Sequence, residues 1–108
     1  QSILLLDTDQ QKGQIDLFFA DSNAGDLGSL DGAIDLTDAE AVNLLGVEVV
    51  ASYIDGAALW SVCQKSNVGM TIKAASNSKS IYVGGVMRSS GKDYDADGIQ
   101  LKIGIIKD

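Results

Sequence analysis

The residues best suited to chemistry in this sequence are three aspartates in the segment Asp93–Gly98, DYDADG. Alternate carboxylates followed by glycine form the first half of an EF-hand calcium loop, in which the acids converge on a hard cation and the glycine allows a sharp turn. The twelfth position of such a loop carries a bidentate glutamate, but Gly104 occupies it here. Two interpretations stay open: a calcium site formed by Asp93, Asp95 and Asp97, or a solvated acidic hairpin loop. The missing glutamate favours the second, so we expect no bound metal.

Other catalytic patterns are weak or absent from the sequence. The chain contains no histidine, which removes Ser-His-Asp triads, Cys-His pairs and most zinc and copper sites. Gly85–Lys92 resembles a phosphate-binding loop, but its glycines are one residue too far apart and Asp93 stands where Ser or Thr is required. The 15 acidic residues include no pair that the sequence singles out as a glycosidase acid and nucleophile. We therefore expect no enzymatic activity, no catalytic residues and no cofactor.

Length and composition indicate an ordered globular protein. The 108 residues, 45% of them hydrophobic, are expected to form a single β-rich domain over residues 1–108. No stretch approaches the roughly 20 apolar residues of a membrane span. The start lacks the basic segment of a signal peptide, and we expect that Gln1 is not the translated start. The single Cys63 has no partner for an internal disulfide and is predicted to be a buried thiol.

Charge is distributed unevenly along the chain. The net charge of −7 argues against nucleic acid and anionic membranes as partners, because both reward basic patches. Residues 1–55 contain eleven acids and only one base, a net charge of −10. Residues 56–92 contain five bases and no acid. Two interpretations stay open: the asymmetry steers self-association, or the fold interleaves the two segments and hides it.

The segment Leu36–Ser52 combines helix and strand signals. Thr37 and Glu40 form a capping-box pattern, in which each side chain satisfies a backbone N–H group at the start of a helix. Three apolar residues then share one helical face: Ala41, Leu44 and Leu45. Gly46 is a suitable residue to end the helix. The pattern predicts a short helix over residues 37–45, followed by a strand.

Apolar runs separated by polar or glycine-containing turns predict a mainly β fold. The predicted strands are Ser2–Leu6, Gln14–Ala20, Val47–Ser52, Trp60–Gln64, Val68–Ala74, Ser80–Arg88 and Ile99–Lys107. A turn is predicted at Asp55-Gly56, and the last strand is expected to point its alternate apolar residues inward: Ile99, Leu101, Ile103 and Ile105. The expected architecture is a β-sandwich or small barrel of about seven short strands with one short helix (37–45).

Four segments resemble a family of small structural proteins of tailed bacteriophages, often encoded near the major capsid gene. In chain order they are QIDLFFADS (14–22), LTDAEAVNLLGVEVVAS (36–52), VCQKSNVGMTIKAASNSKSIYVGGVMRSS (62–90) and LKIGIIKD (101–108). The resemblance covers most of the chain, and its motifs are patterns of strands and one helix. Family members are similar to head decoration (cement) proteins, which sit on the capsid exterior, commonly as trimers. The acidic loop is not a feature of that family.

The resemblance implies a virion structural protein that binds the outer surface of the major capsid protein shell and stabilises it. On this basis we expect a homotrimer whose partner is the major capsid protein, with neither nucleic acid nor membrane as a partner. The alternative is a non-enzymatic β-sandwich binding module for carbohydrate or cell-surface adhesion. Four aromatic residues could stack on sugars: Tyr53, Trp60, Tyr82 and Tyr94. Trp60 and Tyr82 fall within strands and are expected in the core, which weighs against the alternative.

Overall fold

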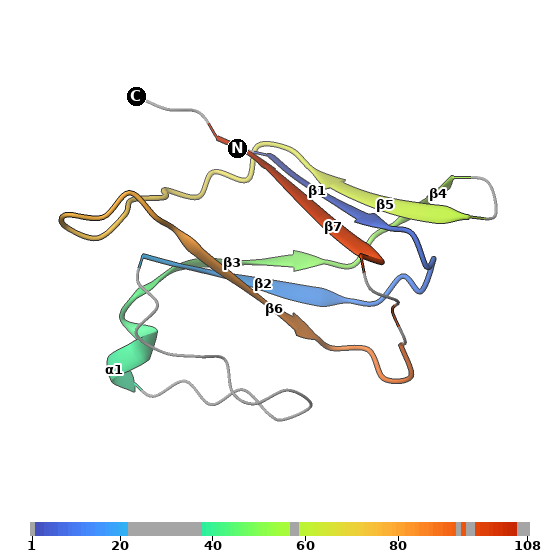
Figure 1. The fold of residues 1–108 in the computed structure, drawn as a ribbon, viewed down its shortest axis with the longest axis horizontal. Helices are drawn as coiled ribbons and strands as arrows, with labels where there is room; N and C mark the ends of the chain where they lie inside the picture. The colour runs from blue at the N-terminus through green and yellow to red at the C-terminus, as the bar shows by residue number, and fades with distance from the viewer. Residues whose placement is uncertain (1, 22–37, 57–58, 93, 95–96, 106–108) are drawn as a thin grey trace. The chain divides into compact units, whose positions relative to one another are not determined.

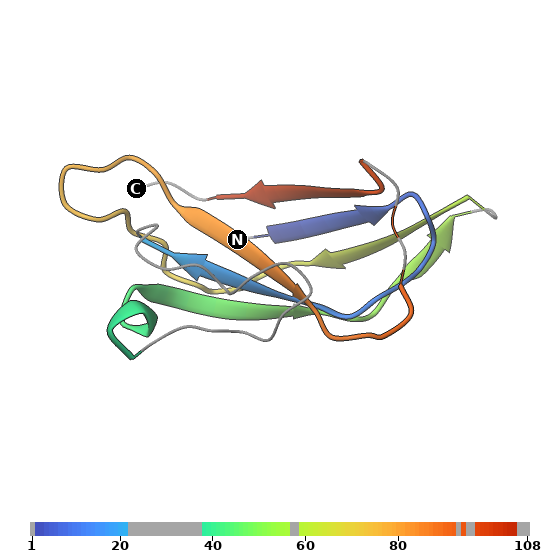
Figure 2. The ribbon, with the colours of Figure 1, turned by 60° about the horizontal axis from the view of Figure 1, so that its bottom comes forward.

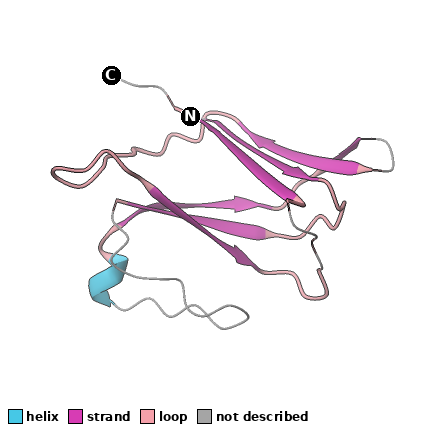
Figure 3. Ribbon diagram, viewed as in Figure 1, coloured by secondary structure: helices cyan, strands magenta, loops and turns pink. Residues whose placement is uncertain are grey.

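The computed structural model describes residues 2–21, 38–56, 59–92, 94 and 97–105. Within these residues the fold is mainly β, with seven strands in two antiparallel sheets and one short helix (Figure 1). The elements are β1 (Ser2–Asp7), β2 (Ile15–Ala20), α1 (Asp38–Ala41), β3 (Leu44–Val50), β4 (Ile54–Gly56), β5 (Trp60–Lys65), β6 (Tyr82–Met87) and β7 (Ile99–Gly104). The predicted mainly β fold is confirmed, and its strand content is consistent with a small β-sandwich (Figure 3).

The chain divides into two compact units, each built from segments that are far apart in the sequence. The first unit comprises Gln1–Ile15, Val50–Gly69 and Met87–Asp108. The second comprises Asp16–Val49 and Met70–Val86. The expectation of one β-rich domain over residues 1–108 stays a prediction.

The first sheet has the strand order β4-β5-β1-β7, and its ladders are antiparallel. The turned view of Figure 2 again shows these strands side by side. Alternate residues of β1 are buried, because successive side chains of a strand point to opposite faces. Leu5, at the centre of β1, lies opposite Cys63 on β5 and Leu101 on β7. Cys63 is buried, which confirms the predicted buried thiol.

The second sheet has the order β3-β2-β6, with β2 at its centre. Three alternate apolar residues of β2 are buried, as the alternation of the sequence predicts: Ile15, Leu17 and Phe19. Phe18, on the opposite face of the strand, is half-buried. The central strand of this sheet therefore contributes apolar side chains on both faces.

The acidic and basic segments of the sequence are interleaved in both sheets. β1, from the acidic residues 1–55, pairs with β5, from the basic residues 56–92. In the second sheet, β2 from the acidic segment lies next to β6 from the basic one. Strand pairing thus mixes the two segments, which favours the second interpretation of the charge asymmetry.

The predicted helix over residues 37–45 is wrong in its extent. α1 spans four residues, and Leu44 and Leu45 already belong to β3. One helical turn gains little from its hydrogen bonds, whereas the β-branched residues that follow favour a strand paired with β2. Thr37 and the side chain of Glu40, the predicted capping box, lie outside the described residues. Within the described part of the chain, no helix is long and apolar enough to cross a membrane.

Gly46 lies inside β3 and does not end a helix. A β-carbon placed on it would lie 2.8 Å from Sδ of Met70. The missing side chain thus makes room for the methionine thioether against the strand. Gly46, which the sequence predicts to end the helix, instead leaves space into which the side chain of Met70 packs.

The predicted strand Val68–Ala74 does not form a ladder. The segment keeps the predicted alternation, with Met70 and Ile72 half-buried and Thr71 and Lys73 exposed. Gly69 has a φ of +71°, a left-handed conformation that interrupts an extended strand. The turn predicted at Asp55-Gly56 is also wrong, because both residues belong to β4, which pairs with β5.

The expected burial of Trp60 and Tyr82 is wrong, since both side chains are exposed. Trp60 begins β5, next to the three-residue edge strand β4, and Tyr82 begins β6, an edge strand of the second sheet. Trp60 lies on an inner strand, but it precedes Ser61, the first residue of β5 in the register with β1, and its partner on β4 is a glycine. Tyr82 lies on an edge strand, which has a neighbour on one side only, so large side chains there are less covered. The same cause applies to β7, which ends at Gly104: Leu101 and Ile105 are exposed, although Ile99 and Ile103 are half-buried.

Candidate interaction surface

Three polar residues form a row across one end of the first sheet. The register pairs Asp7 on β1 with Ser61 on β5, and Ser61 with Asp55 on β4. Directly opposite residues share a face, so these side chains continue the face that carries Leu5. Asp7 and Ser61 are fully buried, and Asp55 is exposed. Buried polar groups need hydrogen-bond partners, which this end of the sheet supplies.

Asp7 organises the loop that follows β1. Its Oδ1 accepts a hydrogen bond from the backbone N–H of Asp9 at 3.0 Å, and its Oδ2 accepts one from the N–H of Lys12 at 2.7 Å. The hydroxyl of Tyr94 also donates to Oδ2, at 3.2 Å. Gln10 and Lys12 adopt positive φ values of 52° and 54°, so the loop is tightly curved. Bonds to a carboxylate hold this otherwise unfavourable backbone in place.

Two tyrosines complete the network around Gly13. The backbone N–H of Gly13 donates to the hydroxyl of Tyr94 at 3.2 Å, and the hydroxyl of Tyr53 donates to the carbonyl of Gly13 at 2.8 Å. Burial raises the pKa of Tyr53, and nearby Tyr94 and Asp7 raise it further. Burial also raises the pKa of Tyr94. Both phenols are therefore held neutral, as hydrogen-bonding anchors of the loop.

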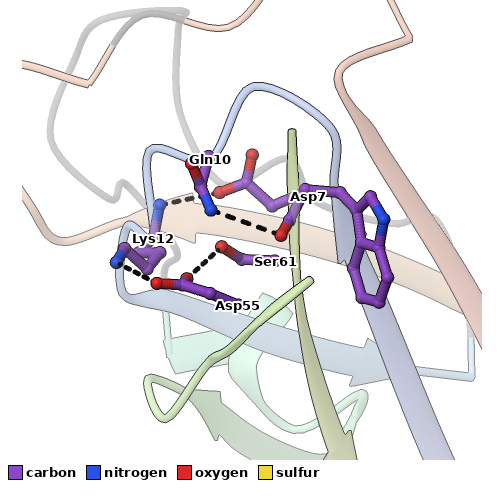
Figure 4. Close-up of polar contacts among 6 residues, drawn as sticks. Asp7, Gln10, Lys12, Asp55 and Ser61 are labelled. Atoms are coloured by element: carbon purple, nitrogen blue, oxygen red, sulfur yellow. Dashed lines mark hydrogen bonds and ion pairs between the residues drawn. The ribbon is translucent and has the colours of Figure 1, made fainter. Parts of the chain in front are cut away.

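Asp55 joins the edge strand β4 to this loop and to β5. Figure 4 shows Lys12 and Ser61 each reaching one oxygen of the Asp55 carboxylate. The ammonium of Lys12 lies 3.1 Å from Oδ2, and the hydroxyl of Ser61 donates to Oδ1 at 2.7 Å. The hydrogen bond from Ser61, followed by that from Lys12, lowers the pKa of Asp55. Ser61 is fully buried with its proton directed at Asp55, so this cluster positions β4 and offers no accessible nucleophile.

The opposite face of the first sheet carries apolar residues that are open to solvent. The register places Ile54, Val62 and Leu6 side by side across β4, β5 and β1. Ile54 is 72% exposed, and Val62 and Leu6 are half-buried. Leu59, in the turn directly before β5, is 73% exposed. Large apolar side chains gathered on an open surface mark an interaction site more often than a single exposed one does.

Trp60 belongs to this surface and is 42% exposed. It lies opposite Gly56 in the β4–β5 register, and its indole occupies the space that a β-carbon at position 56 would need. An aromatic side chain resting on a cross-strand glycine is held in one orientation by the backbone beneath it. We call the apolar residues of the β4–β5 hairpin the hairpin surface: Ile54, Trp60 and Val62, which share this face, and Leu59, the exposed residue before β5.

The residues that the sequence singled out for metal or phosphate chemistry are only partly described. Asp97 is exposed with a φ of +62°, and Asp93 and Asp95 lie outside the described residues. Among the residues with a described placement, no group of three or more Cys, Asp or Glu is arranged to hold a metal ion. Gly85 lies within β6, and the segment after it continues into a turn. The expectation that no metal binds here stays a prediction.

Sequence reasoning missed the exposed position of Ile54 on a β-hairpin and the anchoring role of Asp7. The pattern Ile54-Asp55-Gly56 followed by Trp60-Ser61-Val62 contains the alternation that would have indicated a hairpin with one polar and one apolar face. Asp55-Gly56 is a common turn dipeptide, so the sequence predicts a turn at these residues in place of a strand. For Asp7, the bonds from the backbone of Asp9 and Lys12 are local, but the partner Tyr94 is 87 positions away along the chain and no local pattern indicates it.

No family model, no curated protein and no solved structure matches this chain.

Proposed function

We propose that this protein is a virion structural protein of a tailed bacteriophage, a decoration protein that binds the outer surface of the major capsid protein shell and stabilises it. The sequence resemblance supports this function. The observation that carries it is the hairpin surface, an exposed apolar patch on the β4–β5 hairpin. A protein that reinforces a shell acts through protein–protein contact, and such a surface supplies the affinity for one.

The physical properties of the hairpin surface suit a docking site. Burying an exposed isoleucine or leucine contributes about 1.5–3 kcal/mol, so Ile54 and Leu59 together hold substantial binding energy. Tryptophan is enriched among the residues that dominate interface energies. The bonds that Asp55 makes with Lys12 and Ser61 fix β4 before any partner arrives. A surface that is ordered beforehand loses less conformational entropy on binding.

Binding to purified shells of the major capsid protein tests this function. Shells that lack the decoration protein are mixed with wild-type protein, with Ile54→Asp and with Val42→Asp, and bound protein is measured by sedimentation. Val42 is the matched control because it is an equally exposed apolar residue in the second unit. We expect wild type and Val42→Asp to bind at near stoichiometric copy number and Ile54→Asp to bind about 10–100-fold more weakly. Absence of wild-type binding, or of the protein from purified virions, would contradict the proposal.

The exposure of Trp60 favours a second candidate, a carbohydrate-binding or cell-surface module. One side of the indole rests on Gly56, and the ring remains accessible to a sugar. Aromatic rings are the usual stacking platforms for apolar sugar faces. A glycan array separates the two candidates: specific binding that Trp60→Ala abolishes would support the second, whereas a blank array combined with shell binding supports the first.

The assembly that we propose on the shell is a closed homotrimer joined head to tail. A cyclic interface brings together two different patches of neighbouring subunits. Lys73 and Lys79 lie between β5 and β6, outside the strands whose pairing mixes the acidic and basic segments. Both are exposed in the second unit and are candidates for the basic side of such an interface. Exposed ion pairs contribute only about 0–1 kcal/mol each, so charge would set orientation and association rate more than affinity. Reversing both lysines to glutamate should therefore slow trimer formation, measured by time-resolved light scattering.

A further inference from the structure

β3 is an apolar strand at the edge of the second sheet. The order β3-β2-β6 gives it a ladder neighbour on one side, β2, among residues 2–21, 38–56, 59–92, 94 and 97–105. It is seven residues long, LLGVEVV, and Glu48 is its only charged residue. Natural edge strands are usually shortened, bent by proline or protected by lysine, because their backbone groups can pair with another chain. β3 is not shortened and has no proline or lysine, so Glu48 is its one protective charge.

The two faces of β3 differ in how they are covered. Gly46 lies under the thioether of Met70, and Glu48, on the same face, is half-buried. The other face carries Leu45, Val47 and Val49, since alternate residues of a strand point the same way. Val47 is 45% exposed and Val49 is 41% exposed. An edge without a second ladder partner among the described residues and an open apolar face thus coincide along one element.

The sequence of β3 is complementary to itself in one antiparallel register. With a two-fold axis at Val47, the two Val47 residues face each other, Leu45 faces Val49, and Glu48 faces Gly46. The open faces of the two strands then form one continuous apolar cluster. Moving the axis to Glu48 places two carboxylates directly opposite each other, which is destabilising. Moving it to Gly46 sets glycine against glycine and loses the central valine pair.

We propose that β3 is the contact between two copies of this chain, which pair antiparallel about Val47 and continue the second sheet across a two-fold axis. Main-chain hydrogen bonds along the open edge and the cluster of Leu45, Val47 and Val49 hold the contact. It is isologous, because the same strand contributes on both sides. It is therefore separate from the head-to-tail trimer and from the hairpin surface, and it rests on neither.

Cysteine substitution tests the register directly. Residues opposite each other in an antiparallel pair have Cα atoms about 4.5–5.5 Å apart, within the range of a disulfide. Val47→Cys should therefore cross-link to itself when oxidised glutathione is the oxidant, giving a covalent dimer on a non-reducing gel. Val49→Cys should not, because it faces Leu45, but a mixture of Val49→Cys and Leu45→Cys should. The native Cys63 is buried, and Val42→Cys, in the turn before β3, controls for random collision.

The mass of the assembly provides a second and independent measurement. Val47→Lys should halve the molar mass that light scattering gives for the wild type, whether the wild type is a dimer or a pair of trimers, while Val42→Lys should leave it unchanged. Far-ultraviolet circular dichroism checks that both variants stay folded. The proposal is overturned if Val47→Cys cross-links no better than Val42→Cys, if Val49→Cys cross-links to itself as well as Val47→Cys does, or if a folded Val47→Lys keeps the wild-type mass.

Discussion

Gly56 and Trp60 face each other across β4 and β5, and the indole lies where a side chain at position 56 would begin. The atoms nearest to that site are Cζ2, Cε2 and Cη2, so the six-membered part of the ring covers the glycine. This contact orders the aromatic residue of the hairpin surface without burying it. It also explains why a three-residue edge strand can end in glycine at this point.

Gly56→Ala should displace the indole and destabilise the protein. The new methyl group cannot coexist with the present ring position, and overpacking of this kind costs about 1–3 kcal/mol. Urea unfolding measures the loss, and tryptophan fluorescence reports the displacement of Trp60. In a Trp60→Ala background the same substitution should cost less than about 0.5 kcal/mol, because nothing then occupies the site. If Gly56→Ala lowers the free energy of unfolding equally with and without Trp60, the loss of stability does not come from displacing the indole.

Asp7→Asn should destabilise the protein by about 1.5–3 kcal/mol. The amide keeps the shape of the carboxylate, but only its one oxygen can still accept a hydrogen bond. Either the bond from Asp9 to Oδ1 or the bonds from Lys12 and Tyr94 to Oδ2 are therefore lost. Hydrogen bonds to buried charged groups have this magnitude. Asp38→Asn, at an exposed position in α1, is the matched control and should change the free energy of unfolding by less than about 0.5 kcal/mol. If the two variants unfold at the same urea concentration, Asp7 is not an anchor of the loop.

Periodicity alone locates most strands of this fold. β1 and β2 alternate buried apolar residues with less buried ones, and their central positions in the sheets make that pattern strict. The predictions fail where long-range pairing decides the outcome. Leu44 and Leu45 fit a helical face, but in the structure they belong to β3, which is hydrogen-bonded to β2. Val68–Ala74 alternates as a strand does, yet it acquires no ladder in the described structure.

The candidate surface was less predictable than the core, for a physical reason. Whether Trp60 is buried depends on its pairing: it lies opposite Gly56 and just outside the register of β5 with β1, and the β5–β1 ladder joins residues far apart in the chain. Local sequence reports the alternation of a strand but not the number of its neighbours. The same limit applies to Asp7, whose partner Tyr94 lies near the other end of the sequence.

Millimolar calcium should leave the melting temperature nearly unchanged. The half-motif Asp93–Gly98 lacks the bidentate glutamate that completes an EF-hand loop, so the aspartates should act as a solvated turn. Differential scanning fluorimetry with calcium, and with magnesium as the control for charge screening, measures this. A ligand at about 100 times its dissociation constant would stabilise the native state by about 2.7 kcal/mol. A calcium-specific rise that Asp95→Ala abolishes would instead assign a metal site to this loop.

Alkaline pH should destabilise the protein through Tyr53 and Tyr94. Burial raises the pKa of both phenols in the folded state, whereas an unfolded tyrosine titrates near its ordinary value of about 10. The stability that the neutral phenols contribute is therefore fully present below pH 10 and is lost as the pH rises from there toward the folded-state pKa values.

Urea unfolding between pH 8 and pH 11.5 should show this decline in the wild type. Tyr53→Phe should lower the free energy of unfolding by about 1 kcal/mol at pH 8, because the bond to the Gly13 carbonyl is lost, and should flatten the alkaline decline. Tyr82→Phe is the matched control, because it removes the same hydroxyl group from an exposed tyrosine. If the free energy of unfolding falls as steeply with pH in Tyr53→Phe and Tyr94→Phe as in Tyr82→Phe, other groups cause the alkaline loss of stability. The two phenols would then not anchor the loop in their neutral form.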